Sequence, residues 1–394
     1  FQARRSARQP CKMVRAGQLG TNAGTFLALL GSSPSGWRRS VSTHAAISES
    51  AGTFEIDLLS PARISLFLRV MGRRDDGFHE CASLFQAINM GDRLRLARIP
   101  ADSFAAAGVV RPSRKLEPIK QHVEFSTSPS DLSSLPTDQT NLVVRALTLY
   151  RNKLAERDGG SLAVPRFRAH LVKQIPIDSG LGGGASNAAT ALFGANELCG
   201  RPASRMELAK WASELGSDVA SFLSGAGTSL CTGRAIFLRT DRVQSVSSLA
   251  HSGGFFIISV KVSLSTPALF RGLEATNYSS ISSLSPHELL AAISASQGQC
   301  PQLPEDAAFF VNDLEAPALQ CSPELSTVHT RLLKDECFRV VAMSGAGPSF
   351  FAFGRPDGGE TQEAFAVRFA RECTEATGVQ INVWPVQFAI PWRV

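Results

Sequence analysis

The stretch that decides the fold is Pro176-Ile177-Asp178-Ser179-Gly180-Leu181-Gly182-Gly183-Gly184-Ala185-Ser186-Asn187-Ala188-Ala189. From Gly180 to Gly184 four of five residues are glycine, so the backbone can adopt positive φ angles and several N–H groups can converge on one anion. Small residues that favour a helix continue to Ala195. Because the N–H groups at a helix N-terminus attract phosphate, the stretch predicts a phosphate-binding loop.

This loop differs from two common phosphate-binding patterns. No Gly-Lys-Ser or Gly-Lys-Thr follows the glycines, which excludes a Walker A loop. No acidic residue ends a second strand about 20 residues later, as a dinucleotide-binding fold requires. A flexible glycine hinge is the alternative interpretation, but the alanine-rich helix that follows directly favours the phosphate loop.

The rest of the chain mixes strand and helix patterns without a strict alternation of the two, which predicts an α+β fold. A capping box, in which Ser204 and Glu207 pair across one turn, predicts a helix start. The expected elements are strands over 54–70 broken at Pro61, helices over 141–154 and from 204 to Gly216, and a strand over 255–262.

The first 48 residues carry seven basic side chains and no acidic one; the first acid is Glu49. A leader that is rich in Arg and Ser and free of acids is typical of an organelle transit peptide, so we predict a leader over 1–53 and a plastid location. A disordered basic arm is the alternative. The apolar run from Thr25 to Leu30 is also compatible with the core of a secretory signal in front of the transit peptide.

Composition excludes several other classes of protein. The chain has 394 residues, of which 44% are apolar, so it can bury a core and is not a disordered protein. Residues 49–394 hold 33 basic and 34 acidic side chains, which argues against a nucleic acid partner. No apolar run reaches the roughly 18 residues of a membrane span. The eight cysteines form no CxxC pair, so neither a disulfide scaffold nor a zinc site is expected.

The glycine-rich loop over 176–189 resembles the phosphate-binding motif of the GHMP kinases. The triple glycine followed by Ser-Asn-Ala-Ala is most similar to the family of 4-diphosphocytidyl-2-C-methyl-D-erythritol kinases. Further family motifs resemble this chain in the same order, so the resemblance spans 54–394. They lie at 61–68, 74–79, 141–146, 216–219, 311–315 and 344–347.

The resemblance implies a two-domain GHMP kinase fold. An N-terminal domain like ribosomal protein S5 domain 2 would span 54–245, and a ferredoxin-like C-terminal domain would span 246–394. The implied activity is ATP-dependent phosphorylation of the 2-hydroxyl of 4-diphosphocytidyl-2-C-methyl-D-erythritol, a step towards isoprenoid precursors. The implied ligands are this small cytidine compound, ATP and Mg²⁺, with no nucleic acid or membrane partner.

The family motifs also imply the site residues. Asp218 would orient and deprotonate the acceptor hydroxyl, with Arg63 as its partner; an N-cap is the alternative role for Asp218. Ser186 is additionally a candidate Mg²⁺ ligand. The residues implied to bind ATP phosphates are Pro176, Gly180, Leu181, Gly182, Gly183, Gly184, Ala185, Ser186 and Asn187. Those implied to bind the substrate are Ser65, Phe78, His79, Thr266, Phe270, Gly345 and Gly347, the three aromatic rings around cytosine.

Four positions depart from the family pattern. Arg63 stands where lysine is usual, and arginine keeps the charge but cannot relay a proton. Ser65 replaces an asparagine, Asp178 replaces a glycine beside the triphosphate, and Pro348 removes one N–H from the C-terminal glycine loop. These departures keep two alternatives open: a GHMP kinase for another small alcohol such as homoserine, and a non-catalytic nucleotide-binding paralogue.

The leader generates a first prediction. Because residues 1–48 have no periodic apolar face, removal of residues 1–52 is expected to change the free energy of unfolding by less than about 0.5 kcal/mol. Kinase activity is also expected to stay unchanged. Thermal unfolding and phosphoryl-transfer assays of the chain starting at Thr53 test this, and a loss of solubility or stability would contradict it.

Overall fold

The computed structural model describes residues 54–73, 75, 79–99, 122–127, 135–136, 138–157, 165–225, 227–234, 240–246, 255–275, 309–354, 356 and 359–392. The predicted leader over 1–53 lies outside the described residues, and so does Phe78. No helix in the described ranges is long and apolar enough to cross a membrane.

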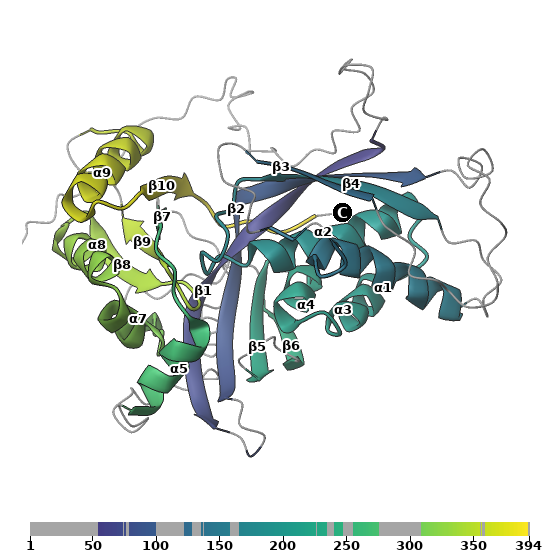
Figure 1. Cartoon of the computed structure of the whole chain (residues 1–394), viewed down its shortest axis with the longest axis horizontal. Helices are drawn as coiled ribbons and strands as arrows, with labels where there is room; N and C mark the ends of the chain where they lie inside the picture. The colour runs from purple at the N-terminus through teal and green to yellow at the C-terminus, as the bar shows by residue number, and fades with distance from the viewer. Residues whose placement is uncertain are drawn as a thin grey trace, which may run out of the picture. The chain divides into compact units, whose positions relative to one another are not determined.

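The first of two sheets has six strands, in the order β3-β4-β2-β5-β6 with β1 paired to β2 (Figure 1). Its pairs are antiparallel except for β3 with β4. The strands are β1 Ile56–Arg73, β2 His79–Ile99, β3 His122–Thr127, β4 Arg166–Lys173, β5 Thr228–Arg234 and β6 Thr240–Val246. The predicted break at Pro61 is wrong: β1 continues through it with a shift of register between Pro61 and Arg63. A bulge at this point interrupts the hydrogen-bond ladder where Pro61 has no N–H to donate, so the strand continues beyond it.

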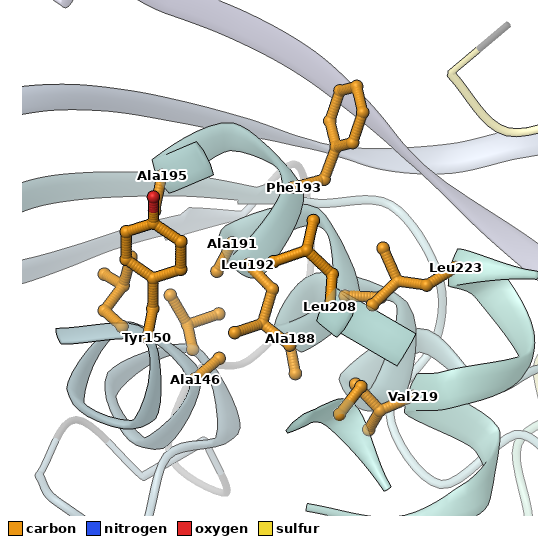
Figure 2. Packing of buried hydrophobic residues seen from close by; sticks show 14 of the residues in the cluster. Ala146, Tyr150, Ala188, Ala191, Leu192, Phe193, Ala195, Leu208, Val219 and Leu223 are labelled. Atoms are coloured by element: carbon orange, nitrogen blue, oxygen red, sulfur yellow. The ribbon is translucent and has the colours of Figure 1, made fainter. Parts of the chain in front are cut away.

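Four helices cover one face of this sheet: α1 Leu142–Arg157, α2 Gly183–Leu198, α3 Arg205–Ala212 and α4 Ser217–Leu223. Their apolar side chains form one core with the sheet, and Figure 2 shows Tyr150, Leu192 and Val219 converging from α1, α2 and α4. The predicted capping box at the start of α3 is confirmed. The expected helix from 204 to Gly216 ends earlier, because α3 stops at Ala212, and a separate helix, α4, begins after Gly216.

The second sheet has four antiparallel strands in the order β10-β7-β9-β8. It contains β7 Phe255–Val260, β8 Phe338–Met343, β9 Ser349–Gly354 and β10 Ile381–Val386, with helices α5 Thr266–Ala275, α7 Glu315–Cys321, α8 Pro323–Lys334 and α9 Gln362–Thr377. Strands and helices follow one another in the ferredoxin-like order, with helical segments between β7 and β8 and between β9 and β10. The predicted α+β class is confirmed.

Hydrogen bonds between described segments join the two sheets. The segment before α7 pairs with β1, since the Leu68 N–H donates to the Val311 carbonyl at 2.7 Å and the Asp313 N–H donates to the Leu68 carbonyl at 3.0 Å. After β10, the tail returns to the first sheet, where the Ala389 N–H donates to the Ala87 carbonyl at 2.9 Å. The last described residue of the tail is Trp392, which is 7% exposed.

Trp392 gives a second prediction. Its ring stacks on Phe193 with centroids 4.9 Å apart, and its Nε1–H donates to the Leu59 carbonyl at 2.9 Å. Trp392→Ala should lower the free energy of unfolding by about 3–5 kcal/mol, because a large buried ring is lost. Trp392→Phe keeps the stacking and loses one hydrogen bond, so about 1 kcal/mol is expected. Equal effects of the two changes in denaturant unfolding would contradict this account.

Candidate active site

The glycine-rich loop connects β4 to the N-terminus of α2. Gly180 has φ +74° and Gly182 has φ +70°, a region that residues with a Cβ rarely adopt. Gly182 is the N-cap of α2 and has no side chain to cap it. The free N–H groups of the first helical turn therefore remain available to an anion, as the sequence predicts.

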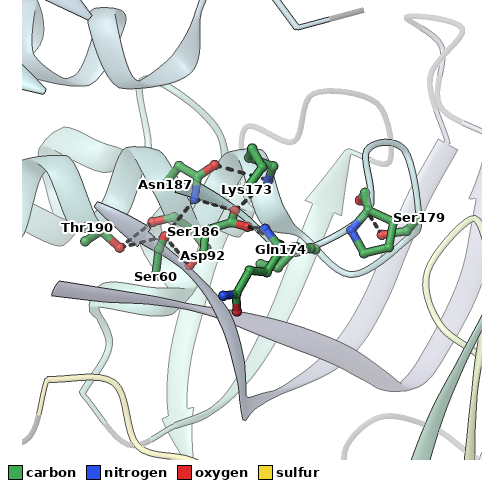
Figure 3. A network of polar contacts seen from close by, with 10 residues as sticks. Ser60, Asp92, Lys173, Gln174, Ser179, Ser186, Asn187 and Thr190 are labelled. Atoms are coloured by element: carbon green, nitrogen blue, oxygen red, sulfur yellow. Dashed lines mark hydrogen bonds and ion pairs between the residues drawn. The ribbon is translucent and has the colours of Figure 1, made fainter. Parts of the chain in front are cut away.

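Beneath the loop lies a network of buried polar side chains centred on Asp92, which is fully buried (Figure 3). One carboxylate oxygen of Asp92 accepts from the N–H groups of Gln174 and Ile175 at 2.7 and 2.8 Å. The other accepts from Lys173 Nζ at 2.5 Å and from Asn187 Nδ2 at 2.8 Å. Asp92 thus holds the chain on both sides of the glycine loop. Sequence reasoning missed Asp92 and Lys173, because nothing around either residue marks it.

The predicted phosphate ligands Ser186 and Asn187 face this network. Ser186 is fully buried, and its Oγ lies 3.1 Å from Ser60 Oγ. Asn187 Nδ2 also donates to Ser60 Oγ at 2.8 Å. Ser186 lines neither the cavity beside Arg63 and Phe270 nor the cavity beside the glycine loop. The prediction of Ser186 as a Mg²⁺ ligand therefore finds no support in the geometry, since its hydroxyl is turned to the helix–sheet interface.

Arg63 and Asp218 lie far apart in the sequence and are brought together by the fold. Arg63 follows the register shift in β1, and Asp218 lies in the first turn of α4. Arg63 Nη2 lies 2.5 Å from Asp218 Oδ2, and the two side chains are 10% and 23% exposed. The N-cap position of α4 belongs to Gly216, so the alternative role of Asp218 as a cap is not observed.

Arg63 is held by two further groups. Its Nη1 donates to the Gly180 carbonyl at 2.5 Å. Its guanidinium lies over the Phe85 ring, 4.4 Å from the centroid. The planar, permanently charged guanidinium can satisfy the carboxylate, the carbonyl and the ring at the same time, which a lysine ammonium could not do with the same geometry.

Two cavities adjoin at this ion pair. A cavity of about 290 Å³ is lined by Arg63, Ser65, Phe270 and Gly345 among others. A second cavity of about 560 Å³ is lined by the loop from Pro176 to Gly184 and by α1 residues. Four residues line both cavities: Leu142, Ala185, Thr266 and Asp218. The Asp218 carboxylate therefore lies where a ligand in the smaller cavity would meet a ligand in the larger cavity.

Four polar atoms of residues that line the smaller cavity have no hydrogen-bond partner among the described residues. They are Arg63 Nε, Ser65 Oγ, Ser217 Oγ and Asp218 Oδ1. A buried polar atom without a partner is costly, so these atoms are suited to a ligand that brings its own polar groups.

The C-terminal glycine loop between β8 and β9 packs against the first loop. Gly345 lines the smaller cavity, but Gly347 lines neither cavity. A Cβ added to Gly347 would lie 2.6 Å from Met343 Sδ, so this glycine serves close packing. Leu181, another predicted ligand, has its side chain buried in the core, which leaves only its backbone for a phosphate. Asp178 is exposed and has φ +52°.

The predicted aromatic site has an unexpected arrangement. His79 and Phe270 stack on each other, with centroids 4.6 Å apart and 21° between the ring planes. Both rings are buried, and only Phe270 lines the smaller cavity. No base fits between two rings at that separation, so a planar ligand would stack on the free face of Phe270 or move one ring.

Comparisons with known proteins agree with this geometry. Residues 141–226 match the model of the GHMP kinases N-terminal domain. The chain is 37% identical to the 4-diphosphocytidyl-2-C-methyl-D-erythritol kinase of Protochlamydia amoebophila, over 80% of this chain and 90% of that protein. It is 33% identical to the chloroplastic protein of the same name from Oryza sativa subsp. japonica, over 79% of this chain and 67% of that one.

Solved structures show the same fold. A crystal structure of 4-(cytidine 5'-diphospho)-2C-methyl-D-erythritol kinase superposes with a TM-score of 0.55 at 25% identity, over 84% of this chain and 99% of that one. Homoserine kinase from Cytophaga hutchinsonii superposes with a TM-score of 0.52 at 18% identity, over 89% of this chain and 98% of that one. The second similarity concerns the fold alone.

The close contact of the two glycine loops gives a third prediction. A Cβ on Gly180 would overlap the Ser344 carbonyl oxygen and lie 2.8 Å from the Gly347 carbonyl oxygen. Gly180→Ala should therefore cost about 1–2 kcal/mol for its positive φ and about 1–3 kcal/mol more for displaced backbone. Gly200→Ala is the matched control, because Gly200 has φ +80° and nothing within 4 Å of its added Cβ. Equal losses in thermal unfolding would show that the loops separate freely.

Proposed function

Since this chain belongs to the family of 4-diphosphocytidyl-2-C-methyl-D-erythritol kinases, we propose that it transfers the γ-phosphoryl group of ATP to the 2-hydroxyl of 4-diphosphocytidyl-2-C-methyl-D-erythritol. The single observation that carries this proposal is the position of Asp218. This carboxylate lines both cavities, pairs with Arg63 and keeps one oxygen without a partner. The larger cavity would hold ATP, because the glycine loop lines it.

The glycine loop, Asp218 and Arg63 would each have a separate role in phosphoryl transfer. The N–H groups of the glycine loop and of the first turn of α2 would hold the phosphates of ATP. Asp218 Oδ1 would accept a hydrogen bond from the 2-hydroxyl and take its proton as the oxygen attacks the γ-phosphorus. The bond between the γ-phosphorus and the β–γ bridging oxygen breaks, and ADP leaves with the electron pair. Arg63 would hold the Asp218 carboxylate in position through their ion pair.

The ion pair between Arg63 and Asp218 argues against a non-catalytic paralogue. Arg63 departs from the usual lysine, yet it makes the ion pair with Asp218 at 2.5 Å. Because arginine does not release a proton, the proton from the acceptor would stay on Asp218 until solvent removes it. The replacement of the usual lysine by Arg63 therefore changes where the proton goes after Asp218, and Asp218 remains the base.

ATP-dependent kinases use Mg²⁺ to neutralise the phosphates, and this chain offers little for it to bind. Within the described residues, no group of three or more His, Cys, Asp or Glu side chains could hold a metal ion. Ser186 is buried, and Oδ2 of Asp218 is engaged by Arg63. We therefore assign no protein ligand to Mg²⁺ and derive no step through it.

Phe270 supports the cytidine part of the proposal. Its ring lines the smaller cavity, and α5 also brings Thr266 to the boundary of the two cavities. A cytosine ring would stack on Phe270, with His79 behind it as a second aromatic layer. A small alcohol such as homoserine has no ring to use this surface, which favours the cytidine substrate over the alternative kinase.

We also propose a plastid location and a division into two domains. The plastid location is supported by the basic leader and by relatives from plants whose names include "chloroplastic". The division into 54–245 and 246–394 is supported by the sheets, since the last strand of the first ends at Val246 and the first strand of the second begins at Phe255. Import of a leader fusion into isolated plastids tests the location.

The fourth prediction concerns Asp218 and Arg63. Asp218→Asn keeps the shape and removes the charge and basicity, so kcat should fall by about 10²–10⁴-fold with stability nearly unchanged. Arg63→Lys keeps the positive charge beside Asp218 but not the contact with the Gly180 carbonyl, so it should retain more activity than Arg63→Met, which leaves a carboxylate unpaired and should lose most activity. Steady-state kinetics with ATP, Mg²⁺ and the cytidine substrate test this. Wild-type turnover of Asp218→Asn would remove its catalytic role.

The fifth prediction separates the cytidine site from the ATP site. Phe270→Ala should weaken binding of the cytidine substrate by about 1–3 kcal/mol, or one to two decades, because a stacking surface is lost. ATP affinity should change little, since Phe270 does not line the larger cavity. Titration calorimetry with each ligand measures both. An unchanged affinity for the cytidine substrate would return Phe270 to a purely structural role.

A further inference from the structure

One backbone carbonyl, that of Gly180, connects the phosphate loop to the ion pair. It accepts from Arg63 Nη1 at 2.5 Å and also from Ser344 Oγ at 2.9 Å. The same Ser344 Oγ accepts from the Ser65 N–H at 3.2 Å. A single hydroxyl therefore joins the glycine loop to β1, the strand that carries Arg63 and Ser65.

Ser344 comes from the other sheet and is itself firmly placed. It is fully buried at the end of β8, and its own N–H donates to the Ser349 carbonyl at 2.8 Å. Its two neighbours are held by one side chain: Asn312 Nδ2 donates to the Met343 carbonyl at 2.7 Å and to the Gly345 carbonyl at 2.8 Å. The hydroxyl is thus presented from a rigid turn.

We propose that Ser344 is a positioning residue for phosphoryl transfer: its hydroxyl holds the Gly180 carbonyl where Arg63 meets both that carbonyl and Asp218. The inference rests on the proposed function, and it adds a residue that touches neither cavity. Without the hydroxyl, the Ser65 N–H loses its acceptor and the Gly180 carbonyl keeps only Arg63. The Arg63 guanidinium can then move with the glycine loop, so it no longer holds the Asp218 carboxylate in one position.

Ser349 supplies a matched control. It is a serine of the same turn and is equally buried, but its hydroxyl has no hydrogen-bond partner among the described residues. Ser344→Ala and Ser349→Ala therefore remove the same atom from the same hairpin. A general effect of packing should appear in both variants, whereas positioning of the loop should appear only in the first.

The kinetic test uses these two variants and Ser344→Thr in the full chain, with ATP, Mg²⁺ and 4-diphosphocytidyl-2-C-methyl-D-erythritol. Ser344→Ala should lower kcat by about 10–100-fold, with a smaller change in KM for either substrate, because a slight misplacement of reacting groups is costly. Ser344→Thr keeps the hydroxyl and should restore most of the rate. Ser349→Ala should match the parent. Equal rates for the two alanine variants would overturn the proposal.

A double-mutant cycle shows whether Ser344 acts through Arg63. In an Arg63→Met background, Ser344→Ala should change the single-turnover rate by less than about twofold, because the group it positions is absent. The same 10–100-fold loss in both backgrounds would overturn the proposed route through Arg63.

A readout without turnover separates this inference from the proposed function. Amide hydrogen exchange, followed by mass spectrometry, should speed up in the peptides that contain Ser65 and Gly180 in Ser344→Ala and not in Ser349→Ala. If the parent transfers no phosphoryl group, the proposed function fails, and exchange alone decides whether Ser344 holds the loop. Unchanged exchange in Ser344→Ala would overturn the positioning role.

Discussion

The buried carboxylate of Asp92 is the interaction on which the active site depends. It lies at 0% exposure and accepts four hydrogen bonds, two from the backbone before the glycine loop and two from the side chains of Lys173 and Asn187. A buried charge is tolerated only when it is paired and fully hydrogen-bonded. Satisfying Asp92 therefore forces the end of β4 and the start of α2 into one arrangement, and the glycine loop between them has little freedom left.

That constraint explains why glycine is needed where it is. With its ends fixed, the loop must turn sharply at Gly180 and Gly182, and both take positive φ. Gly180 also approaches the backbone of the C-terminal loop so closely that a Cβ would overlap it. The same glycines therefore serve the turn and the junction of the two sheets, and they leave room for the proposed approach of a phosphate.

The proposed catalytic pair, Arg63 and Asp218, is assembled on this frame. β1 runs under the loop and its register shift brings Arg63 towards Gly180, while α4 brings Asp218 from the other side. Arg63 is the link, because its guanidinium contacts the loop carbonyl, the carboxylate and the Phe85 ring together. The substitution of arginine for the usual lysine thus fits a site in which three acceptors surround one cation.

The sequence by itself determined the glycine loop, the helix after it, the capping box at Ser204 and the α+β class. These depend on local chemistry: backbone freedom, helix propensity and a side chain that caps three residues ahead. It also singled out Arg63 and Asp218, although only through a resemblance. Local chemistry misled at Pro61, where pairing with β2 carries the strand through a bulge.

Only the tertiary structure decided which side chains face a ligand. Ser186 follows the loop directly, yet the helical turn points its hydroxyl at Ser60, because α2 buries that side against the sheet. The roles of Asp92 and Ser344 arise from contacts across 95 and 164 residues, to Asn187 and Gly180. A hydrogen bond between such distant segments leaves no pattern in the sequence, since nothing in the chain near one partner specifies which distant residue it will contact. The fold brings them together because buried polar groups must find partners.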